Sequence, residues 1–288
     1  MTHLSLPQSI LPQELPVAEE PELLILRPTR GWTALRLAEL WQFRDLLFSL
    51  AGRDLRLRYK QTALGAAWVL LQPLAAAGIF NFVFGVVAGL HTSFLLTFAG
   101  TAAWALFANT LSKISTCLVG NSHLISKVFF PRLILPFSSV ASSLVDFAIA
   151  MAMLVVLLLV THTAPTLALL TLPLWIALLL ILATGVGLFA ASLMVSYRDV
   201  GYIVPVMLQL LMFASPVAYA TAQVPAKWQT LFMLNPISPL LDGFRWSLTG
   251  NAAPNLPFAL ASALISVAAL ITGVIAFKRM ERRFADVI

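Results

Sequence analysis

The chain has 288 residues and a formal net charge of +6; 60% of its residues are hydrophobic, only 10% are charged, and its mean hydropathy is +0.91. A soluble domain is about 25% charged, so this chain has too few charged side chains to cover a surface in water, and a membrane is its predicted solvent. Its single cysteine, Cys117, excludes an intrachain disulfide, and its four scattered histidines lack the spacing of metal ligands.

The N-terminal part is predicted to lie outside the hydrocarbon layer. Residues 1–30 are rich in proline and glutamate and lack the features of a signal peptide, so we expect a flexible cytoplasmic tail. Within residues 31–63, Phe43, Leu47 and Leu50 recur at helical spacing, which predicts an amphipathic helix in the cytoplasmic interface. Four cations end this helix: Arg53, Arg56, Arg58 and Lys60. They either contact head groups or only anchor the first span, and both interpretations stay open.

Six stretches are apolar enough to be predicted as membrane-spanning helices, for which about 20 residues are needed. They are residues 64–87, 93–111, 133–160, 172–196, 200–217 and 256–277. The fifth is short and is bracketed by Pro205 and Pro216. With six spans, 16 of the 18 lysines and arginines fall on one side, which predicts that both termini are cytoplasmic. The spanning domain is thus assigned to residues 64–278 and a cytoplasmic end to residues 279–288.

The first span contains Pro73 about nine residues from its start, next to Gln72. Proline frees a backbone carbonyl and bends a helix, which is tolerated in a membrane where the bend faces protein or water. Gln72 also needs a polar partner. The pair therefore suggests that the first span lines a pathway.

The connection over residues 113–132 is expected on the cytoplasmic side. Its "SHLISKVFF" stretch predicts a short amphipathic helix, which Pro131 ends before the third span. Because many of these residues are apolar, we expect this helix to dock onto another protein surface rather than form a solvated turn.

Asp146 is the only ionisable residue predicted deep in a span. A charge there is costly, so such a residue is a functional candidate by default. Ser142 and Ser143, one turn earlier, could hydrogen-bond its carboxyl group. We favour a structural role between helices over a proton relay, because a relay would need further acids in the membrane.

The outer connection between the last two spans, residues 215–250, is long and mostly apolar. Pro225, Pro236 and Pro239 divide it into pieces too short to span. They are predicted to be two short helices that dip into the outer leaflet as a re-entrant hairpin.

Four blocks of this sequence carry a resemblance: "RDLRLRYKQTALGAAWVLLQPL", "VGNSHLISKVFFPRLILP", "SPVAYATAQVPAKWQTLFMLNPISPLLDGFRWSLTG" and "FKRMERRFADVI". In this order they resemble the membrane subunit, or permease, of type-2 ABC exporters, in the branch that exports O-antigen, capsule and teichoic-acid polymers. The similarity covers about residues 35–288. It implies an all-α polytopic protein of a bacterial inner membrane, with an interfacial helix, a cytoplasmic coupling helix and an outer gate hairpin.

The resemblance also implies partners. A homodimer of permeases would bind two cytoplasmic ABC ATPase subunits, and the cargo would be a polysaccharide on undecaprenyl diphosphate. This chain would bind no cofactor, with ATP and Mg²⁺ on the ATPase. The sequence agrees, because no lysine follows a glycine as a P-loop requires.

Candidate residues follow from this cargo. Sugars favour aromatic faces, so the predicted pathway residues are Gln72, Pro73, Phe80, Asn81, Phe84, Met212 and Phe213. Trp104 and Phe107 form a further aromatic pair; for every such ring, packing or lipid contact is the alternative. The diphosphate would contact Arg53, Arg56, Arg58 and Lys60, which anionic lipid could equally bind. The ATPase would contact His123, Leu124, Ile125, Lys127, Phe129, Phe130 and Arg132, and the outer gate would comprise Trp228, Phe232, Phe244, Arg245 and Trp246.

Two other functions remain as alternatives. A drug, peptide or other lipid exporter could share this architecture, because fold does not fix cargo. A membrane glycosyl or phosphate transferase is the less favoured one. It would need convergent acids or a metal, and only Asp242 on the outer face and Asp146 in the membrane offer a carboxylate.

Overall fold

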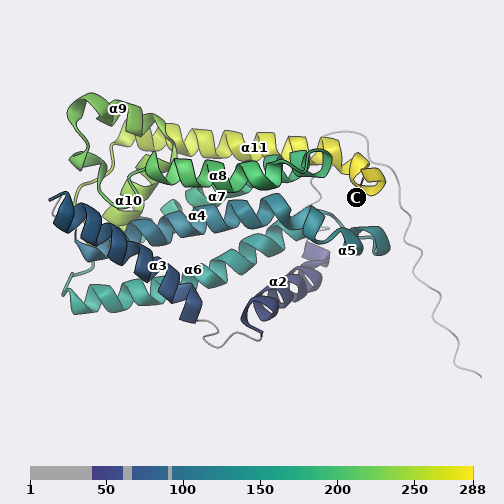
Figure 1. The fold of residues 1–288 in the computed structure, drawn as a ribbon, viewed down its shortest axis with the longest axis horizontal. Helices are drawn as coiled ribbons and strands as arrows, with labels where there is room; N and C mark the ends of the chain where they lie inside the picture. Colours follow the sequence, from purple (N-terminus) through teal and green to yellow (C-terminus); the bar gives the residue numbers. More distant parts are fainter. Residues whose placement is uncertain (1–40, 61–66, 90–92, 288) are drawn as a thin grey trace, which may run out of the picture. The chain divides into compact units, whose positions relative to one another are not determined.

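The computed structural model describes residues 41–60, 67–89 and 93–287, which all belong to the second of the chain's two compact units, Arg36–Ile288. The tail expected over residues 1–30 lies outside the described residues. Within the described ranges every regular element is a helix, as predicted for a polytopic membrane protein (Figure 1).

The helices have the following bounds: α2 Arg44–Tyr59, α3 Ala67–Phe80 with a π-helical continuation Asn81–Val87, α4 Phe94–Gly120, α5 Ser122–Lys127, α6 Ile134–Val160, α7 Leu172–Ser196, α8 Val200–Phe213, α9 Ala226–Leu234, α10 Ile237–Thr249 and α11 Leu256–Val287. Short 3₁₀ turns precede α7 at Leu167–Thr171 and α9 at Thr221–Gln223.

Five of the described helices are long and apolar enough to cross a membrane. They correspond to the predicted first, second, third, fourth and sixth spans. The predicted fifth span ends early, because α8 has only 14 residues. At 1.5 Å per residue it is about 21 Å long, against about 30 Å for the hydrocarbon core. Figure 1 shows α8 lying lengthwise in the bundle, and it packs against α4 and α7.

The second span also differs from its predicted bounds. We expected it to end at residue 111, before the charge of Lys113, but α4 continues to Gly120. Lys113 forms an ion pair with Asp146 of α6, so its charge is compensated inside the bundle and does not end the helix.

The core is built around α4. In the most apolar 18-residue stretch of α4, 72% of the residues are buried. In the corresponding stretch that begins at Leu70 of α3, only 6% are buried, so α4 is central and α3 peripheral. Phe98 and Phe107 of α4 and Leu179 of α7 are among the fully buried side chains. The outward side of α3 and its continuation stays apolar and exposed, as Ile79 and Phe82 illustrate.

Glycines allow α7 and α11 to cross closely. A Cβ atom on Gly185 would collide with the backbone of Ala269 and Leu270, and one on Gly273 would collide with the backbone of Gly185. Small residues at such crossings are typical of membrane helices, which associate by close packing.

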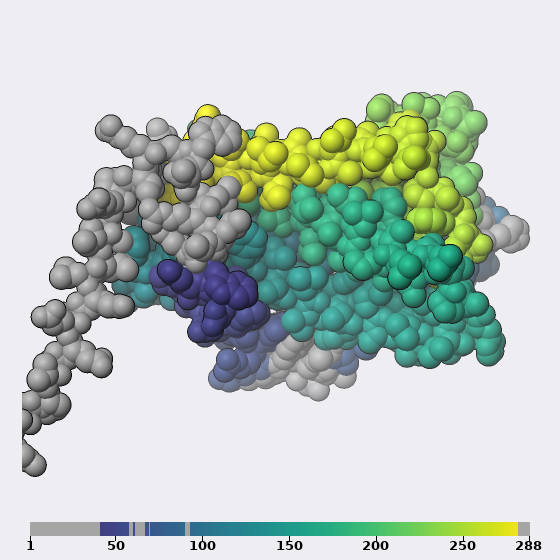
Figure 2. All heavy atoms as spheres, turned by 180° about the vertical axis from the view of Figure 1, so that it is seen from behind, coloured from purple at the N-terminus to yellow at the C-terminus, as the bar shows by residue number. Residues whose placement is uncertain are grey.

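The two ends of the bundle carry different elements. Figure 1 shows α5 and the C-terminal part of α11 at one end, and α9 and α10 at the other. In Figure 2 the yellow α11 runs along the face seen from behind, and the purple α2 lies at the end where α11 finishes. The candidate sites therefore lie at two ends, which we name the coupling end and the outer end after the roles predicted for them.

Candidate functional site

The coupling end centres on the short helix α5 and the residues after it. Leu124 and Ile125 are partly buried against the core, whereas the side chains of His123, Ser126, Lys127, Val128 and Phe129 are exposed. We call these five exposed residues the coupling patch. Phe130 is 5% exposed and belongs to the core, while Phe129 is 67% exposed. Of the two phenylalanines predicted to contact an ATPase, only Phe129 is therefore available on the surface.

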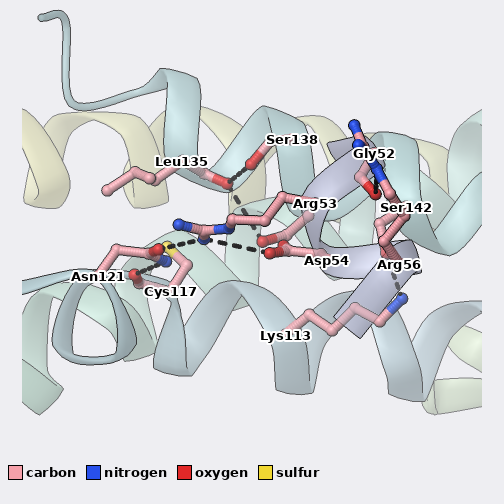
Figure 3. A network of polar contacts seen from close by, with 11 residues as sticks. Gly52, Arg53, Asp54, Arg56, Lys113, Cys117, Asn121, Leu135, Ser138 and Ser142 are labelled. Carbon is pink, nitrogen blue, oxygen red and sulfur yellow. Dashed lines mark hydrogen bonds and ion pairs between the residues drawn. The ribbon is translucent and has the colours of Figure 1, made fainter. Parts of the chain in front are cut away.

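Two hydrogen bonds hold the ends of residues 121–132, which we call the coupling segment. Arg53 Nη2 of α2 donates to Asn121 Oδ1 at 2.5 Å, at the junction of α4 and α5 (Figure 3). After the patch, Arg132 Nη1 donates to the Glu281 carbonyl of α11, and Lys278 pairs with the Glu281 carboxylate at 2.9 Å. Arg132, a predicted ATPase contact, thus also anchors the segment to α11.

The helix α2 packs on protein where we expected it to lie on lipid. Leu50 and Ala51 are buried, and Leu50 shares a cluster with Ile114 of α4 and Phe130. Its exposed apolar residues are instead Phe48 and Leu57. Periodicity finds an apolar face but does not say whether protein or lipid covers it.

The cations of α2 likewise include one that contacts protein and others that are exposed. Arg53 turns inward to Asn121 and to Asp54, 3.2 Å away, while Arg56 and Lys60 are exposed. The side chain of Arg58 lies outside the described residues. A hollow of about 800 Å³ beside α2 is lined by Ser49, Leu50, Arg53, Leu55, Arg56, Leu57 and Lys60.

An ion pair joins α4 and α6 inside the bundle. Lys113 Nζ lies 2.9 Å from Asp146 Oδ2 and donates a second hydrogen bond of 2.9 Å to Ser142 Oγ. Ser142 is thus near Asp146 as predicted, but it accepts from the lysine, and Ser143 donates to the Ser139 carbonyl. Sequence reasoning missed Lys113 because it was assigned to the cytoplasmic connection. The demand of a membrane carboxylate for a cation could have pointed to it.

At the outer end, α8 is followed by a buried segment without helical structure. Residues 215–218 are all buried. Val217 N donates to the Ser215 carbonyl at 2.8 Å, but the irregular backbone leaves the carbonyls of residues 216–218 to partners from other elements. Irregular backbone at such depth requires partners from the protein. Asn235 Nδ2 donates to the Ala214 carbonyl at 3.2 Å and to Ser215 Oγ at 2.7 Å. Thr97 Oγ1 of α4 donates to the Ala218 carbonyl at 3.3 Å.

Arg245 of α10 satisfies the carbonyls of Pro216 and Val217. Its Nη2 donates to the carbonyls of Pro216 and Val217 at 2.7 and 2.5 Å, and its Nε donates to the Leu96 carbonyl at 3.2 Å. Its Nη1 lies 3.4 Å from Asp242 Oδ1. Burial raises the pKa of Asp242, and the guanidinium beside it acts in the opposite direction. Arg245 is 5% exposed, so this predicted gate residue lies inside the protein, where it connects α10 to α4 and to residues 216 and 217.

The two helices of the outer connection, both predicted to dip into the outer leaflet, differ in their burial. Phe244 of α10 is fully buried against Phe147, and Trp246 packs against the core. By contrast, Trp228 of α9 is 49% exposed, with the Lys227 ammonium 5.7 Å from its ring centroid. Only α9 is therefore peripheral.

Four aromatic rings form a continuous row at the outer end. The Phe80 and Phe84 centroids are 6.1 Å apart, those of Phe84 and Tyr219 are 5.5 Å apart, and those of Tyr219 and Phe232 are 6.4 Å apart. We call these four residues the aromatic row. Phe84 lies in the π-helical stretch, a feature that is frequent at functional sites. Tyr219 was not predicted, and its place directly after "SPVA" was the only signal.

Of the other predicted pathway residues, Asn81 directly follows Phe80 at the start of the π-helical stretch, and Pro73 lies inside α3. Gln72 is exposed on α3, and Phe213 is 61% exposed at the end of α8, where Met212 packs against the core. Trp104 and Phe107 are 5.6 Å apart and buried, so their role is packing.

Comparisons with known proteins point to one family. The family model described as "ABC-2 type transporter" matches residues 45–249. An O-antigen export system permease protein RfbA of Klebsiella pneumoniae is 27% identical over 249 residues, covering 85% of this chain and 95% of the relative. The protein of that name from Myxococcus xanthus is 28% identical over 252 residues, covering 86% and 97%.

Proposed function

The chain belongs to the ABC-2 type transporter family, and we propose that it is the permease through which an ATP-driven exporter moves undecaprenyl-diphosphate-linked polysaccharide of the O-antigen type across the bacterial inner membrane. A permease of this family is a non-catalytic membrane subunit. The names of the relatives, O-antigen export system permease, support the polysaccharide as cargo.

The aromatic row is the observation that carries this proposal. It joins α3 to α9 through Tyr219, with neighbouring centroids 5.5–6.4 Å apart. An aromatic contact contributes about 0.5–1.5 kcal/mol, which is weak enough for successive sugars to exchange along a series of rings. A sliding polymer needs such a series of equivalent, shallow contacts.

The coupling patch is the proposed docking surface for the ATPase. Phe129 and Val128 are large, exposed and apolar, and Lys127 beside them is charged, a mixture that suits a protein contact. We propose a homodimer of this chain with two ATPase subunits, which bind the ATP and Mg²⁺. The phosphates of the lipid carrier would meet the exposed cations Arg56 and Lys60 at the hollow beside α2.

A membrane transferase is a weaker alternative. Asp146 is paired with Lys113 and Asp242 lies beside Arg245, so both candidate carboxylates are engaged. A drug or peptide exporter of the same architecture differs only in cargo. This alternative would be supported if the aromatic row bound amphipathic molecules in place of sugars.

The test uses the complex of this chain with its ATPase in lipid vesicles. Undecaprenyl-diphosphate-linked glycan should stimulate ATP hydrolysis, whereas undecaprenyl phosphate alone or an amphipathic drug should not. Phe80→Ala with Phe84→Ala should remove the stimulation and leave basal hydrolysis unchanged, because the row reaches α9, at the opposite end of the bundle from α5 (Figure 1). Leu70→Ala, on the inner half of α3, is the matched control. Stimulation by the drug and none by glycan would contradict the cargo.

A further inference from the structure

We propose that Arg245 is the positioning residue of the aromatic row: by holding the carbonyls of Pro216 and Val217 it fixes Tyr219 between Phe84 and Phe232. The inference rests on the proposed function only in assigning this row to the cargo. It concerns how the row is built, which the contacts of Arg245 describe directly.

The guanidinium has little capacity left for cargo. Of the five N–H donors of an arginine, four meet the carbonyls of Leu96, Pro216 and Val217 and the carboxylate of Asp242. The side chain is buried, and its charge is balanced locally by Asp242. A bidentate contact with the carrier's phosphates is therefore closed to it, and its effect on transport must act through the groups that it holds.

The carbonyl groups that Arg245 holds lie shortly before Tyr219 in the chain. Arg245 holds residues 216 and 217, and Thr97 holds the carbonyl of Ala218, so three successive carbonyls before the tyrosine are fixed to α10 and α4. The Tyr219 ring is the link between Phe84 and Phe232, which lie on elements far apart in the sequence. If residues 216–218 move, this link is the contact that breaks.

Gly100 of α4 provides the space for this arrangement. A Cβ atom there would collide with Arg245 Nη2 and with the Val217 carbonyl, the two partners of one of the hydrogen bonds. Gly100→Ala should thus displace the Arg245 guanidinium from the α4 side without changing any residue of the aromatic row. Gly78 of α3 is the matched glycine control, because a Cβ atom on Gly78 would meet open space.

The experiment measures the proximity of positions 84 and 219 by cross-linking. Phe84→Cys and Tyr219→Cys are introduced into the full complex with Cys117→Ala, and the yield with a short bismaleimide is read by mass spectrometry of the joined peptides. Arg245→Lys, whose single ammonium cannot span the separated carbonyls, should lower the yield roughly tenfold, as should Gly100→Ala. Thr97→Val, which keeps the shape of the side chain, should lower it roughly two- to tenfold. Gly78→Ala should leave it unchanged.

Wild-type yields in Arg245→Lys and Gly100→Ala would overturn the proposal. If Arg245→Lys fails to fold, Gly100→Ala decides, because its Cβ atom would displace the hydrogen bond between Arg245 Nη2 and the Val217 carbonyl. Cross-linking is done without cargo, so its outcome is separate from the glycan-stimulation test. A lowered cross-linking yield in a complex that glycan does not stimulate would support the positioning role of Arg245 and contradict the proposed cargo.

Discussion

At the residue scale, the Lys113–Asp146 pair shows how this bundle accommodates charge. Both side chains are mostly buried, at 18% and 8% exposure, and Ser142 accepts a further hydrogen bond from the lysine. Removing one partner of a buried pair leaves an uncompensated charge, whereas replacing both by apolar groups is often neutral or stabilising. The pair connects α4 and α6, the two helices on either side of the coupling segment, which supports the structural role that we favour for Asp146.

We predict that single substitutions of this pair destabilise the fold and that the double substitution restores it. Lys113→Met or Asp146→Leu alone should each lower the free energy of unfolding by about 3–5 kcal/mol. Lys113→Met with Asp146→Leu should recover most of this loss. The measurement is the monodisperse fraction that remains after stepwise heating in detergent. A double variant no better than the worse single one would indicate that the charge itself is needed, as a proton relay would require.

At the element scale, the coupling segment combines residues that hold it with residues that it presents. Asn121 and Arg132 are bound to α2 and α11, and Phe130 is in the core, while Phe129 is exposed. Two adjacent phenylalanines thus have opposite environments. Phe129 is available to a partner, and Phe130 belongs to the buried cluster that it shares with Leu50 of α2 and Ile134 of α6.

Substitutions of these two phenylalanines should therefore fail in different ways. Phe129→Asp should leave the permease inserted and folded but reduce copurification of the ATPase and transport, because only an exposed contact is lost. Phe130→Ala should lower the free energy of unfolding by about 3–5 kcal/mol, as large-to-small changes in a core do. Membrane-inserted protein, heat stability and bound ATPase are measured on the same preparations. Equal destabilisation by both variants would contradict the assigned environments.

The predictable and unpredictable parts of this fold divide by the range of the interactions. Length and hydropathy located five spans, and prolines located the breaks around α9, because these signals are local. The end of α8 depends on Arg245, Asn235 and Thr97, which reach residues 214–218 from other elements. The position of Tyr219 and the pairing of Lys113 depend equally on contacts far apart in the sequence. A single sequence gives the candidates for such contacts but not their partners.

At the scale of the whole molecule, the short helix α8 decides the topology. If α8 crosses the membrane, α5 and α9 lie on opposite sides and both termini lie on the side of α5. If it does not, α5 and α9 share a side. Figure 1 favours crossing, because α8 connects the end of the bundle near α5 with the end near α9. The buried segment 215–218 continues the chain at this outer end and compensates for the shortness of α8 with polar partners.

We predict six spans with α9 outside and α5 and the C-terminus in the cytoplasm. Single cysteines at two exposed positions, Ala226→Cys in α9 and Ser126→Cys in α5, are introduced with Cys117→Ala and labelled with a membrane-impermeant maleimide. In intact spheroplasts Ala226→Cys should react and Ser126→Cys should not, whereas permeabilised cells should label both. A chain with Cys117 as its only cysteine is the blank, because that side chain is buried. The charge distribution leads to the same expectation, since 15 of the 18 lysines and arginines, all except Lys113, Lys227 and Arg245, then lie on the cytoplasmic side. Protection of Ala226→Cys together with Ser126→Cys would show that α8 does not cross, and the outer gate would have to be placed on the cytoplasmic side.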